Sequence, residues 1–409
     1  GFSMSMSQGV AKQTRFKRQG AKGTLAGDTA GQILRRVKSI FELQKETYNT
    51  ADEITSTQQL VSNRHGVRQV NGSIEGILTP GTYSDIMSAI LRRDFAAVAD
   101  LTGISLTITG TGPVYTLARA AGSYLTGGLK VGMVVRAAAA GLNAANASKN
   151  VLILSVTALE ITVLVLNGSA LVAEGPIATT TISVPGKVTY VPTSGHTKVY
   201  YTVEEWYPDV PSSERNQDVV IGAFNLALPG TGNATVNITA LGLDQSKDTT
   251  AYFTAPASET TTEALVAASG ALLVNGVAQA IVTDLQINID ANQAAADGVV
   301  GTNIRPDVFV GKVLVSGQFT AYFDSADIPD LFNNETAFGL VSALLAGSEA
   351  NADFMTFSLS KMKLNSNTPD DAETGLKRVY QYQAQLNTAG HATTAQHHLT
   401  TLQVQDSAA

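Results

Sequence analysis

Two stretches of the chain align with later stretches without a gap, and this internal similarity constrains the fold more than any other feature. Residues 37–85 fall on residues 282–330 at an offset of 245, and residues 223–246 fall on residues 384–407 at an offset of 161. The matched pairs are Val37 with Val282, Asp52 with Asp297, Gly66 with Gly311, Val70 with Val315, Gly72 with Gly317, Asp85 with Asp330, Ala223 with Ala384, Thr239 with Thr400, Leu241 with Leu402 and Ser246 with Ser407. Because the offset falls from 245 to 161, the first copy carries a net 84 extra residues. The sequence therefore predicts one structural unit built twice, a construction for symmetry rather than for a single active site.

The composition favours a chain that is covered by other subunits. Only 15% of the 409 residues are charged, which would leave a monomer with a poorly hydrated surface. The chain has no cysteine, so disulfides, thiolate zinc sites and cysteine nucleophiles are excluded. The formal net charge of −7 disfavours nucleic-acid binding through an overall basic field. The most apolar run, residues 151–166, is too short to span a membrane and is typical of two adjacent strands.

The apolar pattern predicts a mainly β fold with two tandem β-sandwich or barrel units, each with a short α-helix, and a small β-domain inserted in the first. The expected boundaries are a basic N-terminal arm at 1–30, a discontinuous first unit at 31–100 and 196–246, an inserted β-domain at 101–195, a linker at 247–280 and a second unit at 281–409.

Local patterns predict individual elements. Residues 84–95 and 333–346 each carry an amphipathic stripe that is typical of a short helix. Two Asn-Gly pairs, at 167–168 and 275–276, predict tight turns, and the first is expected inside a hairpin. In the last strand of each copy the apolar phase shifts by one residue, before Leu241 and before Leu402, which indicates a shared β-bulge.

The residues that could bind a metal do not have the spacing of a metal site. His391, His397 and His398 lie close together, but neighbouring residues on a strand point to opposite faces, which favours polar strand positions. An acidic loop lacks the alternating carboxylates and distal Glu of a calcium loop, which favours a solvated turn; its members are Asp370, Asp371 and Glu373.

The sequence offers no catalytic constellation. Glu204 and Glu205 could form an acid–base pair, but adjacent strand residues face opposite ways, and surface charges are the favoured interpretation. The Gly-Thr-Gly segments at 110–112 and 230–232 lack the Lys and helix start of a phosphate loop. We therefore expect no enzymatic activity, no cofactor and no metal.

Several stretches resemble the tail tube proteins of long, non-contractile-tailed bacteriophages. The segments GQILRRV at 31–37 and RHGVRQVNGSIEGILTPGTY at 64–83 are similar to the first-domain signature of that family. The segments GQFTAYF at 317–323, NET at 334–336 and TTLQVQD at 400–406 are similar to its second half. The resemblance covers most of the chain apart from residues 101–195 and rests on diffuse patterns.

This resemblance implies a tail-tube fold with a duplicated tube domain and a structural role in the virion tail. Such proteins assemble, in the bacterial host cytoplasm, into stacked rings that conduct DNA during genome ejection. Rings of the family commonly have six units, so two units per chain imply a trimeric, pseudo-sixfold ring, with a hexameric ring as the alternative. The implied partners are further copies of the chain, the tape measure, tail terminator and distal tail proteins, and double-stranded DNA bound non-specifically in transit, with no membrane.

Three groups of residues are the candidate contact sites. Polar strand faces are candidates for the lumen, with outer solvent as the alternative: Gln69, Asn71, Ser73, Glu75, Ser316, Gln318 and Thr320. Two loops at equivalent positions, 45–59 and 290–303, are candidates for contact with the next ring through Lys45, Glu46, Asp52, Glu53, Asp290 and Asp297. The N-terminal arm is expected to clamp an adjacent subunit through Lys12, Arg15, Lys17, Arg18 and Lys22.

A second class of function remains open. Tandem β-domains also occur in surface or host-binding proteins, and the inserted β-domain at 101–195 would then bind glycans. The six-unit logic favours the tube subunit, whereas a monomer that binds carbohydrate would favour the binding protein.

Overall fold

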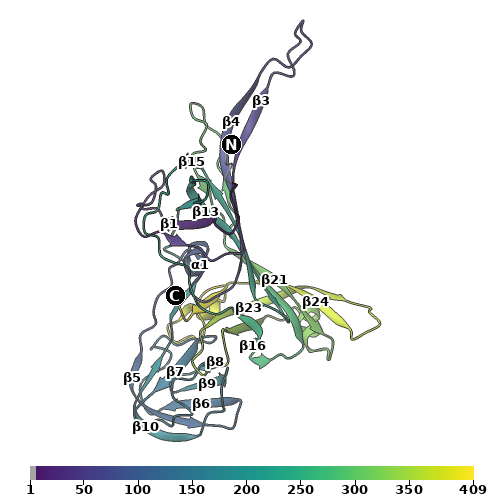
Figure 1. The fold of residues 1–409 in the computed structure, drawn as a ribbon. Coiled ribbons are helices and arrows are strands. Elements are labelled where there is room, and N and C mark those ends of the chain that lie inside the picture. Colours follow the sequence, from purple (N-terminus) through teal and green to yellow (C-terminus); the bar gives the residue numbers. More distant parts are fainter. Residues whose placement is uncertain (1–5) are drawn as a thin grey trace.

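The computed structural model describes residues 6–409, apart from the side chains of residues 268–270. The chain is mainly β and divides into one large sheet assembly and one closed six-stranded barrel (Figure 1). This confirms the expected fold class of β-rich units with an inserted small β-domain. No helix in the described part of the chain is long and apolar enough to cross a membrane.

The large assembly contains most of the strands. Those before residue 250 are β1 (Gln13–Arg18), β2 (Gln32–Ile33), β3 (Lys38–Asn49), β4 (Asn63–Ile77), β11 (Lys187–Tyr190), β12 (Tyr201–Tyr207), β13 (Ser212–Pro229), β14 (Thr235–Gly242) and β15 (Asp244–Asp248). Those after residue 250 are β16 (Val266–Val274), β17 (Val277–Ala278), β18 (Val282–Asp290), β21 (Leu314–Tyr322), β22 (Phe338–Leu345), β23 (Phe354–Pro369), β24 (Lys377–Ala384) and β25 (Gln403–Asp406). A separate small pair is formed by β19 (Ala294–Ala295) and β20 (Val308–Phe309).

Eight of these strands form one continuous antiparallel run. The order is β3-β4-β14-β13-β18-β21-β24-β23, with every neighbouring pair joined by backbone hydrogen bonds. The strand β13 lies at the centre because its C-terminal half pairs with β14 on one side and with β18 on the other. A single sheet therefore passes from the first half of the chain into the second.

The pairing pattern of the first four strands recurs in the last four. Pairing β4 with β21 at the offset of 245 places Ile74 and Phe319 at the same position, and their partners are then Ile238 and Tyr380. The strand β14 therefore corresponds to β24 at an offset of 142, and β13 corresponds to β23 at 143. The alignment at an offset of 161 is wrong, because its identities are coincidental and do not follow the strand partners. The first half thus carries about a hundred extra residues, and most of them form the inserted barrel.

The first alignment also needs one correction. Counted through their partners on β4 and β21, β3 and β18 correspond at an offset of 246 rather than 245. The buried residues of β18 then fall on the inward positions Ser39, Phe41 and Leu43 rather than on the exposed Ile40. A shift of one residue exchanges the two faces of a strand, so burial decides the register.

A β-bulge is shared by the two halves, but not where the sequence predicted it. The register of β13 against β14 slips between Ile221 and Ala223, and that of β23 against β24 slips between Leu364 and Ser366. These positions correspond at the offset of 143. The expected bulge before Leu241 is absent from β14, whose inward residues alternate without a break, and the residues before Leu402 lie outside any strand. In the first half, the phase shift instead reflects the side chains of Leu241 and Leu243, which enter a separate small apolar cluster.

The two helices confirm one expectation and correct the other. Helix α1 (Ser84–Leu91) lies where the sequence predicts it, directly after the turn at 80–82. The second helix, α2 (Asp327–Asn333), ends where the predicted helix at 333–346 begins, and most of that segment is strand β22. Because β22 is covered on both faces, its apolar run is nearly continuous and imitates a buried helix. A four-residue 3₁₀ helix follows at Thr388–His391.

The inserted barrel closes in the order β10-β5-β6-β9-β8-β7. Its strands are β5 (Leu101–Thr109), β6 (Val114–Arg119), β7 (Val134–Ala138), β8 (Val151–Val156), β9 (Glu160–Val165) and β10 (Glu174–Ser183). Residues 151–166 form two paired strands, as predicted, but the Asn-Gly pair at 167–168 does not close a hairpin, because β9 and β10 have other partners. The Asn-Gly pair at 275–276 does turn between β16 and β17, with both residues at positive φ.

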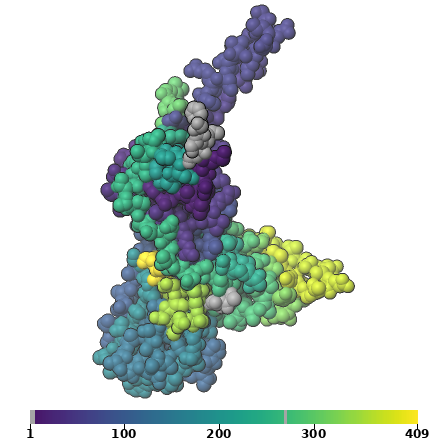
Figure 2. Space-filling view, viewed as in Figure 1, coloured from purple at the N-terminus to yellow at the C-terminus, as the bar shows by residue number. Residues whose placement is uncertain are grey.

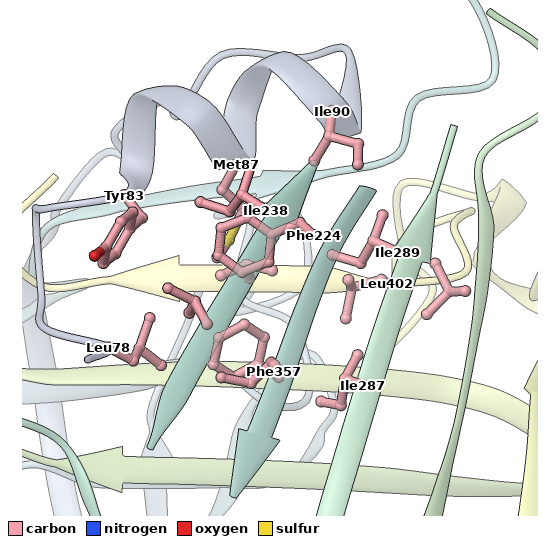
Figure 3. Packing of buried hydrophobic residues seen from close by; sticks show 14 of the residues in the cluster. Leu78, Tyr83, Met87, Ile90, Phe224, Ile238, Ile287, Ile289, Phe357 and Leu402 are labelled. Carbon is pink, nitrogen blue, oxygen red and sulfur yellow. The ribbon is translucent and has the colours of Figure 1, made fainter. Parts of the chain in front are cut away.

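The main core lies between α1 and the central strands. Met87 and Ile90 of α1 rest on Phe224 of β13 and Ile238 of β14, and side chains from the second half complete the cluster (Figure 3). The barrel has its own core and touches the large assembly through a smaller cluster around Phe354. The helix therefore covers one face of the sheet and leaves the other face to its polar side chains.

Candidate functional site

The candidate site is the face of the eight-stranded run that points away from α1, called here the polar face. Alternate residues of each strand reach it because successive side chains of a strand point to opposite sides. One cross-strand row runs through six strands in register: Glu75, Asn237, Asn225, Asn288, Ser316 and Gln383. Amides and hydroxyls thus line the sheet from β4 to β24.

All seven predicted lumen residues lie on this polar face. They are partly exposed, while their strand neighbours Val70, Ile74, Val315 and Phe319 are buried on the opposite side. The register joins the two sets through β14, β13 and β18, so residues far apart in sequence share one surface. Their exposure to a lumen stays a prediction.

The polar face carries few charged side chains. On its six central strands the outward charged residues are Glu75, Asp284, Asp290 and Lys377, and most of the remaining outward positions are polar or small. On the outer strands, cations stand at Lys38 of β3 and Lys363 of β23. A surface of this kind offers phosphates few fixed partners.

Sequence reasoning missed four of the six central strands of the polar face. It selected β4 and β21 but overlooked Asn225, Asn237, Asn288 and Gln381 on the four strands between and beside them. The alternation in DLQINID, at 284–290, is as clear as that in the selected strands, and it was the available signal.

The two candidate loops project from the same end of the molecule (Figures 1 and 2). The first is a β-hairpin, because β3 and β4 extend to Asn49 and Asn63, while the second contains the short β19–β20 pair. Glu46 of the hairpin accepts an ion-pair contact from Arg305 near the second loop, at 2.9 Å. The other five candidates are exposed: Lys45, Asp52, Glu53, Asp290 and Asp297. Their contact with a neighbouring ring stays a prediction.

Residues 1–5 of the N-terminal arm lie outside the described part of the chain. The five cations of the arm lie within it, and they contact other residues of the same chain. Arg18 contacts the carboxylates of Asp85 and Asp94, at 2.7 and 2.9 Å. Lys17 and Lys22 donate to backbone carbonyls, while Lys12 and Arg15 pair with buried glutamates. A clamp on an adjacent subunit stays a prediction.

The interpretation of Glu204 and Glu205 as surface charges is wrong. Both are buried, at 0% and 1% exposure, because β12 is covered on each of its faces. Glu205 binds Lys12 and accepts hydrogen bonds from Thr14 and Ser39. Burial raises the pKa of Glu205 above its ordinary value, although Lys12 acts in the opposite direction. These contacts tie β12 to β1 and β3, which is a structural role.

The remaining titratable groups form no metal site. In the part of the chain that the structure describes, no three His, Asp or Glu side chains are arranged to hold an ion. His398 instead stacks on Tyr190 with ring centroids 4.2 Å apart, and burial lowers its pKa to about 4. The acidic loop at 370–373 is exposed and joins β23 to β24.

Comparison with known proteins agrees with this architecture. A search of curated proteins found no match. The family model for phage tail tube proteins matches residues 7–386. Because this match spans nearly the entire chain, including the inserted barrel and all eight strands of the polar sheet, the chain belongs to the phage tail tube protein family.

Proposed function

We propose that this chain is the self-assembling subunit of a phage tail tube whose stacked rings form the conduit for DNA during genome ejection. The observation that carries the proposal is one sheet of eight strands with an apolar face under the helices and a polar, cation-poor face opposite. A lumen surface of this kind lets a polyanion slide, because no array of Lys or Arg holds the phosphates.

The recurring strand pairing supports a duplicated tube domain and a ring of three chains. Three chains of eight strands each would give a barrel of twenty-four strands. With strands about 4.8 Å apart and tilted by about 40°, such a barrel has a backbone radius of about 24 Å. That size leaves an open channel after side chains are placed, whereas barrels of about eight strands are filled by their own side chains.

The partners follow from this role. The subunit would contact itself within and between rings, the tape measure protein inside the tube, and the terminator and distal tail proteins at its ends. DNA would pass without sequence-specific contacts, since the polar face presents amides and hydroxyls rather than paired cations. The proposal involves no catalysis, and it places the inserted barrel on the outside of the tube.

Electron microscopy of the purified protein at high concentration, together with mass photometry, tests the proposal. Hollow tubes with threefold rings are the expected result. Sixfold rings would keep the tube and remove the trimer. A compact monomer at every concentration would contradict the proposal and favour the alternative, a surface protein that binds glycans through its barrel.

A further inference from the structure

The eight-stranded run ends in two open edges. On one side β3 pairs only with β4, and on the other the C-terminal half of β23 pairs only with β24, among all residues that the structure describes. Residues 365–369 of β23 are partly or fully exposed. In β3, residues 44–49 and the outward side chains of residues 38–43 are exposed. An edge strand with free N–H and C=O groups is a template for another strand.

In the first half of the chain, the strand that corresponds to β23 has a neighbour along the edge that is open in β23. The N-terminal half of β13 pairs with β12, and its C-terminal half pairs with β18 on that same side. The corresponding strand β23 pairs with β22 along its N-terminal half and then has no neighbour on that side. The strand that pairs with the C-terminal half of β13 on this side is β18. The counterpart of β18 in the first half is β3.

We propose that β3 of one copy adds to the C-terminal half of β23 of the next copy, antiparallel, with Thr368 opposite Glu42 and Ser366 opposite Gln44. This inference rests on the proposed function, because it specifies the seam between neighbouring chains of a ring. The partner is a second copy of this chain and not another tail protein.

The register follows from pairs within the chain. Asn225 of β13 lies opposite Asn288 of β18, and Ala223 lies opposite Asp290. Between β13 and β23 the offset is 143, so Asn225 corresponds to Thr368. Between β3 and β18 the offset is 246, so Asn288 corresponds to Glu42. The same offsets carry Ala223 to Ser366 and Asp290 to Gln44.

The side chains at the two edges fit this seam. The buried face of β18 presents Leu285, Ile287 and Ile289, and the corresponding face of β3 presents Ser39, Phe41 and Leu43. Both sets point toward the core, so an added β3 would place its apolar residues under the second half of the neighbour.

Pro369 limits how far the seam extends. Asp370 donates its N–H to the Lys377 carbonyl on β24, so the nitrogen of the preceding Pro369 faces the open edge, where it has no hydrogen to donate. A proline here removes one bond from the ladder and would be excluded from the middle of a strand paired on both sides. The seam is therefore expected to centre on residues 366–368, with the Pro369 carbonyl as its last acceptor.

The proposed seam makes the step between chains the same as the step within a chain. The first half joins the second through β13 and β18, and the second would join the next chain through β23 and β3. Equal steps that complete a full turn close into a ring with pseudo-equivalent units, and both edges of the eight-stranded run are then paired.

Disulfide trapping tests the register cleanly because the chain has no cysteine. Two double variants, Glu42→Cys with Thr368→Cys and Gln44→Cys with Ser366→Cys, are assembled under mild oxidation and run on non-reducing gels. We expect dimers and trimers as the main covalent species, with trimer the largest. Asn225→Cys with Asn288→Cys provides the matched internal pair, which should close within one chain. Thr368→Cys with Gln44→Cys is shifted by two residues and should cross-link several-fold less.

The outcomes separate the seam from the tube. If tubes form and the internal pair closes, but neither inter-chain pair cross-links, the seam is overturned and the tube remains. Preferential cross-linking of the shifted pair would also overturn the register. If the unsubstituted protein forms no rings under any condition, the proposed function and the seam fall together.

Discussion

Replacing Glu204 by alanine should destabilise the chain far more than loss of a surface charge. The Glu204 carboxylate is completely buried and accepts hydrogen bonds from the Ser213 hydroxyl at 2.6 Å and from the Tyr252 and Phe253 backbone N–H groups at 2.5 and 3.2 Å. Arg15 lies 3.6 Å from it. The substitution leaves three donors and one cation without their acceptor.

The expected loss is about 4 kcal/mol. Each orphaned buried donor costs about 1–3 kcal/mol, and removal of one partner from a buried ion pair costs about 3–5 kcal/mol. These values overlap because water can enter the space that the side chain leaves. An exposed pair is worth only about 0–1 kcal/mol, so the two interpretations of Glu204 predict clearly different results.

The assay is urea unfolding of the unassembled protein, followed by tryptophan fluorescence. The single tryptophan, Trp206, lies on β12 two residues from Glu204 and reports directly on this strand. With a slope of about 3 kcal/mol/M, a loss of 4 kcal/mol lowers the midpoint by more than 1 M. Glu214→Ala is the matched control, since its partner Lys247 is 66% exposed and the loss should stay below about 1 kcal/mol. Equal small losses in both variants would refute the buried-anchor account.

Four further changes test the fold and the polar face. Phe224→Ala should cost about 3–5 kcal/mol in urea unfolding because Phe224 is fully buried beneath α1, whereas Phe309→Ala, at 59% exposure, should be nearly neutral. Gly76→Ala should displace the Tyr83 hydroxyl from the Arg35 carbonyl, and the resulting loss of thermal stability should shrink in the Tyr83→Phe background. His398 has a folded pKa lowered to about 4, so the stability it contributes is complete above about pH 6.5 and is lost as pH falls toward 4. That loss is at most about 3 kcal/mol, and His398→Gln should flatten the pH profile of unfolding between these values. Asn225→Lys with Asn288→Lys should give assembled tubes that retain double-stranded DNA at low salt and release it at high salt, unlike the unsubstituted tubes.

The fold class could be predicted because strand periodicity is a local property. Val70 and Ile74 alternate with polar residues in the sequence as they do in the sheet. Helix α1 was predictable for the same reason, since one stripe of its residues meets the core. The strand β22 was not, because both of its faces are covered and its residues carry no alternation that distinguishes strand from helix.

The correspondence between the halves could be predicted only in part. Identities placed β4 on β21 correctly, where Gly72 and Gly317 occupy the same position. They failed for β14, which matches β24 with almost no identical residues, because side chains on a sheet can change while the ladder of backbone bonds is kept. The buried state of Glu204 was hidden for a related reason: it depends on the backbone N–H groups of residues 252 and 253, which only the fold brings near β12.

The matching positions of the β-bulges are stronger evidence for two equivalent units than the sequence identities are. A second slip occurs where β12 pairs with β13, between Tyr201 and Val203, and its counterpart lies between Phe338 and Leu340 where β22 pairs with β23. Taken with the slips at 221–223 and 364–366, both halves bend their longest strand twice at matching places. Bulges increase local twist, so two equal bends give the halves the same curvature. Equal curvature is what a closed ring of repeated units requires, and it is the physical reason to expect that β23 accepts β3 of a neighbour as β13 accepts β18.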